Sequence, residues 1–145
     1  MSENGKQTGR CLCGKVTFTI VEPVDEVGAC HCEMCRRWSS GPFMALGGDY
    51  TVKFEGEENI VRYRSSDWAE RGFCGTCGTN LFYHLISMDQ TILCAGALDD
   101  QSGLTFTDQV FIDEKPEFYS FANETKNMTG AELFALYAPK DGDPA

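Results

Sequence analysis

The chain has 145 residues, of which 42% are hydrophobic, and its 22 Asp and Glu against 12 Lys and Arg give a net charge of -10. This length suits one domain with a core large enough to fold without disulfides. The negative charge disfavours phosphate backbones and anionic membrane surfaces, so we expect no nucleic-acid partner and no membrane partner.

The N-terminal sequence, MSENGKQTGR, has no apolar run of the kind that a signal peptide needs. No stretch approaches the roughly 18 apolar residues of a membrane span. We therefore expect a cytoplasmic protein. Disulfides are rare in that reducing compartment, so the eight cysteines indicate metal or redox chemistry.

Short strands separated by glycine-rich turns dominate the pattern along the chain. In KVTFTIV (15–21), Val16, Phe18 and Ile20 alternate with polar residues, which is the period of a half-buried strand. A turn at EPVDEVG (22–28) and a cysteine-rich segment follow. Further strands are predicted within PFMALGGDYTVKF (42–54), NIVRYRSS (59–66), NLFYHL (80–85), QTILCAGAL (90–98) and, as an edge strand, DQVFID (108–113).

One helix is predicted, in NMTGAELFALYAPK (127–140). Thr129 can cap its first turn, Glu132 stands three residues later as in a capping box, and Pro139 would end it. We expect its apolar face to pack on a sheet; this face is formed by Leu133, Phe134, Leu136 and Tyr137.

These elements predict a single, mostly β domain over residues 9–138 with a C-terminal helix. The segments 1–8 and 139–145 are predicted to be flexible ends.

Seven of the eight cysteines fall in closely spaced sets, CLC, CHCEMC and CGTC. A Cys-x-x-Cys followed by glycine, as in CGTCG, lets two thiolates converge on one ion and needs two further ligands. The CLC pair is the natural donor. We therefore assign Cys11, Cys13, Cys74 and Cys77 to one closed, structural zinc site, with unliganded core cysteines as the alternative.

Cys30, Cys32 and Cys35 then remain together, and three protein ligands with an open fourth position are typical of catalytic zinc. Alternatively, His31, His84 or Cys94 closes the shell and makes a second structural site. His31 stands between two ligands, so its side chain is expected to point away from their ion. Cys94 is expected to be a small buried hydrophobe.

A redox role for Cys32 and Cys35 would call for a helix within a βαβ pattern, and the sequence predicts none. Iron is a further alternative to zinc in the four-thiolate site.

Three thiolates suit a soft incoming ligand, such as a substrate thiol, better than water. A thiol bound at the fourth position would be held as thiolate and could attack an aldehyde carbon. Arg36, next to Arg37, is a candidate for binding a substrate carboxylate, and Trp38 and Phe43 are candidates for the wall of the site. Solvated arginines and core aromatics are the alternative.

The segments GRCLCGKVTF (9–18), CHCEMCRRW (30–38) and RGFCGTCGTNLFY (71–83) resemble the glutathione-dependent formaldehyde-activating enzyme family in order and spacing. The domain of this family, GFA, also includes the centromere protein V type. AGALDD (95–100) resembles the family segment after the knuckle, so the match extends over residues 9–112.

This resemblance implies a zinc-binding β-tent of packed antiparallel sheets. It also implies two zinc ions, a structural one at Cys11, Cys13, Cys74 and Cys77 and a catalytic one at Cys30, Cys32 and Cys35. The implied activity is that of a carbon-sulfur lyase that adds glutathione to formaldehyde and gives S-(hydroxymethyl)glutathione. Relatives often carry a histidine near Gln109 and a tryptophan near Phe118, and this sequence has neither.

We therefore expect an enzyme whose partners are a glutathione-like thiol and a small aldehyde. The alternative is a non-catalytic zinc module that binds a protein partner, because no general acid or base is evident beside the three cysteines. A methionine sulfoxide reductase is a more distant alternative that would need an exposed nucleophilic cysteine outside the metal sites.

Overall fold

The computed structural model describes residues 7–137. The chain divides into two compact units. Of the described residues, the first unit, called here the large unit, contains 7–27 and Met44–Thr105, and the second, the small unit, contains Gly28–Phe43 and 106–137. Of the predicted flexible ends, residues 1–6 and 138–145 lie outside the described residues, whereas Gln7 and Thr8 lie in the first strand. The boundaries of a single domain over residues 9–138 remain a prediction from the sequence.

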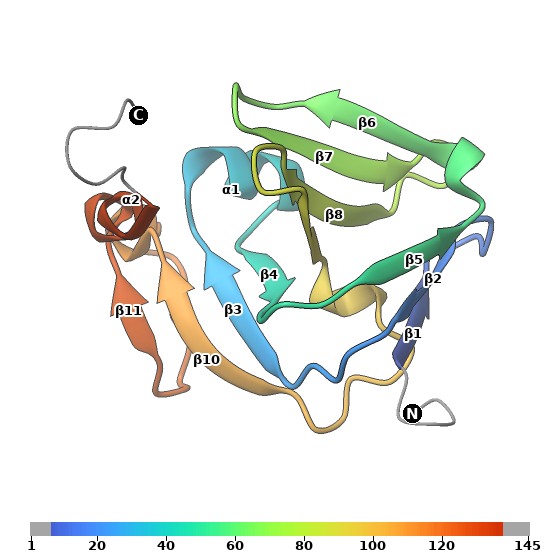
Figure 1. Ribbon diagram of the computed structural model, residues 1–145. Coiled ribbons are helices and arrows are strands. Elements are labelled where there is room, and N and C mark those ends of the chain that lie inside the picture. Colours follow the sequence, from blue (N-terminus) through green and yellow to red (C-terminus); the bar gives the residue numbers. More distant parts are fainter. Residues whose placement is uncertain (1–6, 138–145) are drawn as a thin grey trace. The chain divides into compact units, whose positions relative to one another are not determined.

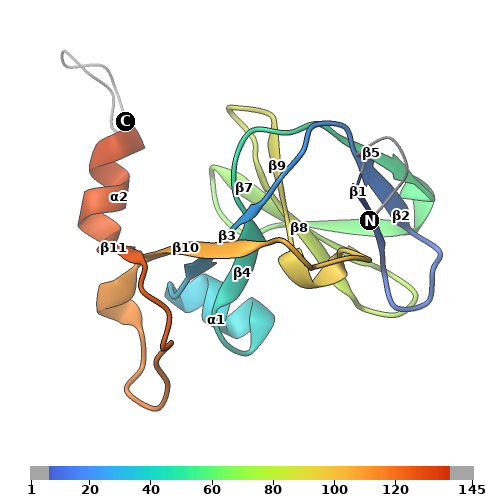
Figure 2. The same ribbon diagram turned by 90° about the horizontal axis from the view of Figure 1, so that it is seen from below.

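The large unit contains two antiparallel sheets (Figures 1 and 2). The first has the strand order β1-β2-β5. Its strands are β1 (Gln7–Arg10), β2 (Thr17–Ile20) and β5 (Val52–Glu55). The second joins four consecutive strands in the order β6-β7-β8-β9. These are β6 (Ile60–Arg64), β7 (Ala69–Cys74), β8 (Asn80–Leu85) and β9 (Gln90–Leu93). Two short 3-10 helices complete the unit, η2 (Glu57–Asn59) and η3 (Ala95–Ala97).

A third sheet has the order β11-β10-β3-β4. Its strands are β3 (Glu26–Cys30), β4 (Phe43–Leu46), β10 (Thr105–Val110) and β11 (Lys126–Met128). β10 and β11 run parallel, and the other assigned strand registers are antiparallel. The prediction that DQVFID forms an edge strand is wrong, because β10 lies between β11 and β3. β11 pairs Asp108 with Lys126, and a partner strand this far along the chain leaves no local signal in the sequence of β10.

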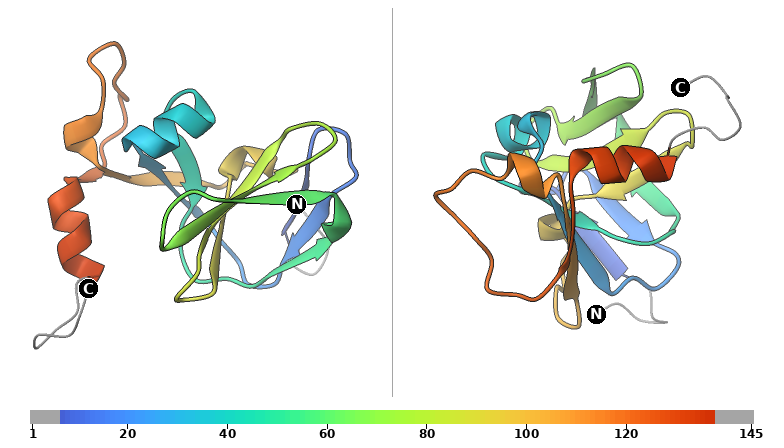
Figure 3. Two further views of the ribbon diagram at one scale, coloured as in Figure 1. Left: turned by 90° about the horizontal axis from the view of Figure 1, so that it is seen from above. Right: turned by 90° about the vertical axis from the view of Figure 1, so that its left-hand side faces the viewer.

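The fold class predicted from the sequence, a mostly β protein with antiparallel sheets and a C-terminal helix, is confirmed. The small unit holds that helix, α2 (Gly130–Tyr137), and two further short helices, α1 (Glu33–Ser39) and η4 (Ile112–Glu114). A long loop joins η4 to β11, and α2 follows β11 directly (Figure 3). None of the helices within residues 7–137 is long and apolar enough to cross a membrane.

Helix α1 was not predicted, because its sequence EMCRRWS is short and carries a cysteine that the spacing assigned to a metal loop. It starts after Cys32, whose Sγ accepts a hydrogen bond from the Cys35 N–H at 3.4 Å. This contact replaces the usual side-chain oxygen of an N-cap residue.

The start of α2 was predicted correctly. The Thr129 Oγ1 accepts from the Glu132 N–H at 3.1 Å, and the Glu132 Oε1 accepts from the Thr129 N–H at 2.8 Å, which is a complete capping box. The expected packing of the apolar face on a sheet is wrong for Phe134 and Leu136, which are 56% and 68% exposed. Phe134 instead meets Phe111 edge-on, at 5.6 Å between ring centroids. Pro139 and the side chain of Tyr137 lie outside the described residues.

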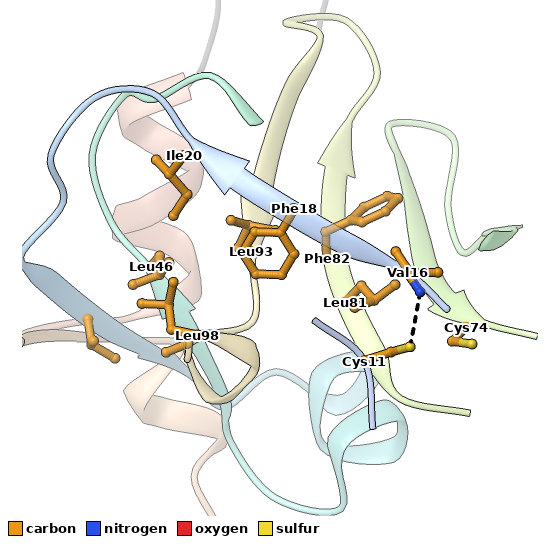
Figure 4. Close-up of a cluster of buried hydrophobic side chains, with 12 residues drawn as sticks. Cys11, Val16, Phe18, Ile20, Leu46, Cys74, Leu81, Phe82, Leu93 and Leu98 are labelled. Carbon is orange, nitrogen blue, oxygen red and sulfur yellow. Dashed lines mark hydrogen bonds between the residues drawn. The ribbon is translucent and has the colours of Figure 1, made fainter. Parts of the chain in front are cut away.

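The core of the large unit forms between its sheets (Figure 4). Val16, Phe18 and Ile20 all point inward, with exposures of 0%, 2% and 0%, which confirms the alternation predicted for this strand. Phe54 lies between Phe18 and Phe82, with centroid distances of 6.0 and 5.4 Å. Two cysteines, Cys11 and Cys74, are fully buried and belong to this core, so the cysteine cluster that contains them packs directly against the apolar side chains.

Two glycines allow the aromatic rings to approach the backbone. A Cβ at Gly72 would lie 2.1 Å from the Cζ of Phe82, its cross-strand partner, and a Cβ at Gly9 would lie 2.1 Å from the Cζ of Phe18. Gly72→Ala should therefore lower the free energy of unfolding by about 2–3 kcal/mol, because the added methyl group would overlap the ring of the fully buried Phe82. Urea denaturation would measure this change. Gly96→Ala is the matched control, since nothing lies within 4 Å of its Cβ position, and equal midpoints for the two variants would contradict the prediction.

Candidate metal centres

The first cysteine cluster lies where two turns of the large unit meet. Cys11 follows β1, Cys13 lies in the turn before β2, Cys74 ends β7, and Cys77 lies in the turn between β7 and β8. Their four Sγ atoms all lie within 4.8 Å of one another. Both turns need a glycine, because Gly14 and Gly78 have φ angles of 83° and 81°.

The distances in this cluster fit a tetrahedral thiolate site. The Sγ of Cys13 lies 3.6 Å from that of Cys11 and 3.8 Å from that of Cys74. A zinc ion with Zn–S bonds of about 2.3 Å places its sulfur ligands about 3.8 Å apart. The cluster therefore has the donors and the size of a closed structural site.

The thiols of this cluster differ in their pKa values. The hydroxyl and the backbone N–H of Thr79 lower the pKa of Cys77 to about 5. The backbone N–H of Lys15 lowers the pKa of Cys13, but desolvation and the neighbouring thiols outweigh it and raise that pKa to about 11. Thiols this close cannot all ionise at neutral pH by themselves, and a divalent cation among them would favour the thiolate form of each one.

The second cluster lies in the small unit, where the chain leaves β3 and enters α1. Cys30 ends the strand, Cys32 is the N-cap of the helix, and Cys35 lies in its first turn. Their Sγ atoms lie within 4.8 Å of one another. Cys35 is buried, and Cys30 and Cys32 are partly buried. The strand-to-helix corner thus directs three thiols to one point, and they fit a soft metal ion.

The neighbouring thiols of Cys32 and Cys35, together with burial, raise the pKa of Cys30. Ionising one thiol therefore opposes ionising the next. A cation bound among the three would remove this opposition, because metal ligation displaces the thiol proton.

No histidine, aspartate or glutamate of residues 7–137 joins the three cysteines within the same distance. Both ring nitrogens of His31 are hydrogen bonded, Nδ1 to the Tyr119 hydroxyl at 2.8 Å and Nε2 to the Gln109 Oε1 at 2.7 Å. The ring therefore points away from the thiols, as predicted. His84 likewise contacts Thr91 through Nδ1 and Asp89 through Nε2.

Cys94 belongs to neither cluster of the described chain. It precedes η3, donates its backbone N–H to the Leu81 carbonyl and is partly buried, whereas a small buried hydrophobe was expected.

The residues predicted to contact substrate are one arginine and two aromatic residues, and all three lie in the small unit. The Nε of Arg36 donates to the His31 carbonyl at 2.8 Å, so this guanidinium is held close to the backbone that carries Cys30 and Cys32. Trp38 and Phe43 meet edge-on at 5.7 Å between centroids. Phe43 is only 5% exposed and thus belongs to the packed interior, whereas Trp38 is partly exposed.

The surroundings of His31 were not apparent from the sequence as part of the site. His31 is fully buried, and burial lowers its pKa; the hydrogen bond to Gln109 raises it, and the nearby charges of Lys115 and Arg36 lower it further. The ring is therefore neutral near pH 7. Its partners lie 78 and 88 residues away in the chain, and no local motif links them to it.

A sequence profile described as glutathione-dependent formaldehyde-activating enzyme matches residues 6–114. The chain belongs to this family. The match covers both cysteine clusters, and it confirms the resemblance inferred from the three cysteine segments.

Two named proteins and one solved structure are similar to this chain. An uncharacterized lyase from Schizosaccharomyces pombe is 36% identical over 126 residues, which cover 86% of this chain and 92% of the relative. A Halomonas elongata protein, named for glutathione-dependent formaldehyde activation, is 32% identical over 83 residues, covering 51% of this chain and 53% of that protein. A crystal structure of a Rhodobacter sphaeroides protein has the same fold, with a TM-score of 0.50 and 25% identity, and covers 69% of this chain and 99% of that one.

Proposed function

We propose that this protein is a zinc-dependent carbon-sulfur lyase that joins a thiol such as glutathione to formaldehyde or another small aldehyde. The observation that carries the proposal is the cluster of Cys30, Cys32 and Cys35, which gathers three soft donors and no fourth among the described residues. Its occurrence in a family named for this chemistry supports it. We also propose that the protein holds two zinc ions and works in the cytoplasm, where glutathione maintains a reducing environment.

The proposed reaction forms one bond between carbon and sulfur. The thiol sulfur attacks the aldehyde carbon, the π electrons of the C=O bond move to oxygen, and that oxygen takes the proton that the thiol has lost. In reverse, the carbon-sulfur bond breaks and the aldehyde is released. A zinc ion bound by the three cysteines would supply the Lewis acidity that holds the substrate sulfur as thiolate at neutral pH.

Arg36 is the residue that we propose for substrate positioning. The protein has a net charge of -10, so an anionic thiol such as glutathione needs a local cation to approach the site. The Nε of Arg36 is bound to the His31 carbonyl. The two Nη groups of a guanidinium can bind a carboxylate in bidentate fashion. Trp38, on the same helix, can provide an apolar side to the site.

Titration with cobalt(II) in place of zinc tests the proposal, because thiolate ligation of this ion is visible in its absorption spectrum. We expect two ions per chain, and we expect glutathione to change the spectrum of one of them. S-methylglutathione, which has no free thiol, is the matched control and should change neither. Failure of every thiol tested to perturb either ion would exclude the lyase and favour a non-catalytic zinc module. If glutathione does perturb one ion, exchange spectroscopy by NMR would measure whether the protein accelerates formation of the thiol–aldehyde adduct.

A further inference from the structure

His31 holds an unusual position, since it separates two of the three clustered cysteines and is itself 0% exposed. Its backbone is fixed on both sides. The N–H donates to the Val110 carbonyl at 3.1 Å, and the carbonyl accepts from the Arg36 Nε at 2.8 Å. The peptide groups that connect Cys30 to Cys32 are therefore tied to β10 and to α1.

The His31 ring is also held by a chain of hydrogen bonds, in which the donor and acceptor of each bond follow from those of the bond before it. The Thr125 Oγ1 donates to the Asn127 Oδ1 at 2.6 Å, so it accepts from the Gln109 Nε2 at 3.0 Å. The amide orientation of Gln109 then presents Oε1 to the His31 ring. A carbonyl oxygen only accepts, so the His31 Nε2 carries the proton.

This tautomer determines the role of the other ring nitrogen. Nδ1 has no proton in a neutral ring that is protonated at Nε2, so it accepts from the Tyr119 hydroxyl at 2.8 Å. Tyr119 is held in turn by Lys115, whose Nζ donates to the Tyr119 carbonyl and, at 3.1 Å, to the Ser120 Oγ. Four polar groups of His31 thus have defined partners, all within the small unit.

We propose that His31 is a positioning residue that fixes the spacing of Cys30 and Cys32 through its buried hydrogen bonds to Gln109 and Tyr119. The inference rests on the proposed function, because it concerns the metal affinity of the same three-cysteine cluster. Groups that orient metal ligands without binding the metal themselves commonly matter for affinity, and their removal weakens metal binding by about 10- to 100-fold. His31 acts here through the backbone on either side of it, and its ring itself binds no metal.

The test compares two pairs of matched variants by cobalt(II) affinity and absorption spectrum. His31→Phe keeps a buried ring without its hydrogen bonds, and His84→Phe removes the polar contacts of a partly buried histidine in the large unit. Tyr119→Phe removes the hydroxyl at the His31 Nδ1, and Tyr50→Phe removes a hydroxyl that joins Leu46 to Leu93 in the large unit. The spectrum of the three-cysteine cluster is obtained as the difference between the wild type and Cys32→Ser.

We expect His31→Phe to weaken cobalt binding at the three-cysteine cluster about tenfold or more and to alter its thiolate-to-cobalt bands, with a smaller change in Tyr119→Phe. The four-cysteine cluster should keep its affinity and spectrum in both variants. The two control variants should leave the three-cysteine cluster unchanged. If His31→Phe does not fold, Tyr119→Phe carries the test by itself.

Unchanged affinity and bands in a folded His31→Phe, or in Tyr119→Phe if only that variant folds, would overturn the inference. This result would leave the proposed function in place, because glutathione can still act at an intact site. Conversely, a wild-type cluster that binds cobalt but responds to no thiol would overturn the proposed function, and the His31 comparison would keep its meaning.

Discussion

Cys74→Ser should leave the protein without a stable fold. Cys74 is fully buried, ends β7 beside the core and is one of the four thiols that fit a structural zinc site. Structural zinc sites contribute about 10–16 kcal/mol of apparent binding free energy at pH 7, whereas small proteins are stable by only about 5–15 kcal/mol. Loss of one ligand thus removes a contribution as large as the total. Circular dichroism and thermal denaturation would measure the loss.

Cys94→Ser is the control for this variant, because Cys94 is partly buried in the same unit and belongs to neither cluster. It should fold with both metal ions and with little change in its melting temperature. A strong chelator should unfold the wild type under the same conditions, with recovery on addition of zinc. A folded Cys74→Ser with wild-type thermal stability would show that the four-cysteine cluster is not a structural metal site.

Cys32→Ser should behave differently and yield a folded protein with one metal ion fewer than the wild type. Its thiol–aldehyde exchange activity should fall to about 1% of the wild-type value or less. The substitution removes one of three ligands from the proposed catalytic cluster. It should not disrupt α1, because the Cys32 Sγ caps this helix by accepting the Cys35 N–H, and a serine hydroxyl is a preferred acceptor at that position. Metal content by mass spectrometry and the rate of thiol–aldehyde exchange are the measurements.

Cys32→Ala separates the two roles of this side chain. It removes the ligand and the cap together, so it should match the serine variant in metal content and be less stable by about 1 kcal/mol. If Cys32→Ser itself unfolds, the three-cysteine cluster is structural and the proposed catalytic role is wrong.

Much of the fold could be predicted from local sequence patterns. The alternation of Val16, Phe18 and Ile20 places these side chains on one face of a strand, and the burial of all three follows from that period. The capping box of Thr129 and Glu132 likewise depends on atoms only three residues apart. Helix α1 escaped prediction because it is seven residues long, and its cap is a thiol that the known preferences for N-caps do not include.

The sequence by itself determined which cysteines form pairs and triplets, because close spacing and turn glycines restrict where the thiols of CLC, CHCEMC and CGTC can point. It also indicated the family through those three segments, and the family match over residues 6–114 confirms it. Only the tertiary structure decided what surrounds them. The partners of the His31 ring, the interior position of β10 and the exposure of Phe134 all depend on residues brought together from distant parts of the chain. Such contacts follow from the packing of whole elements, which no local pattern of residues encodes.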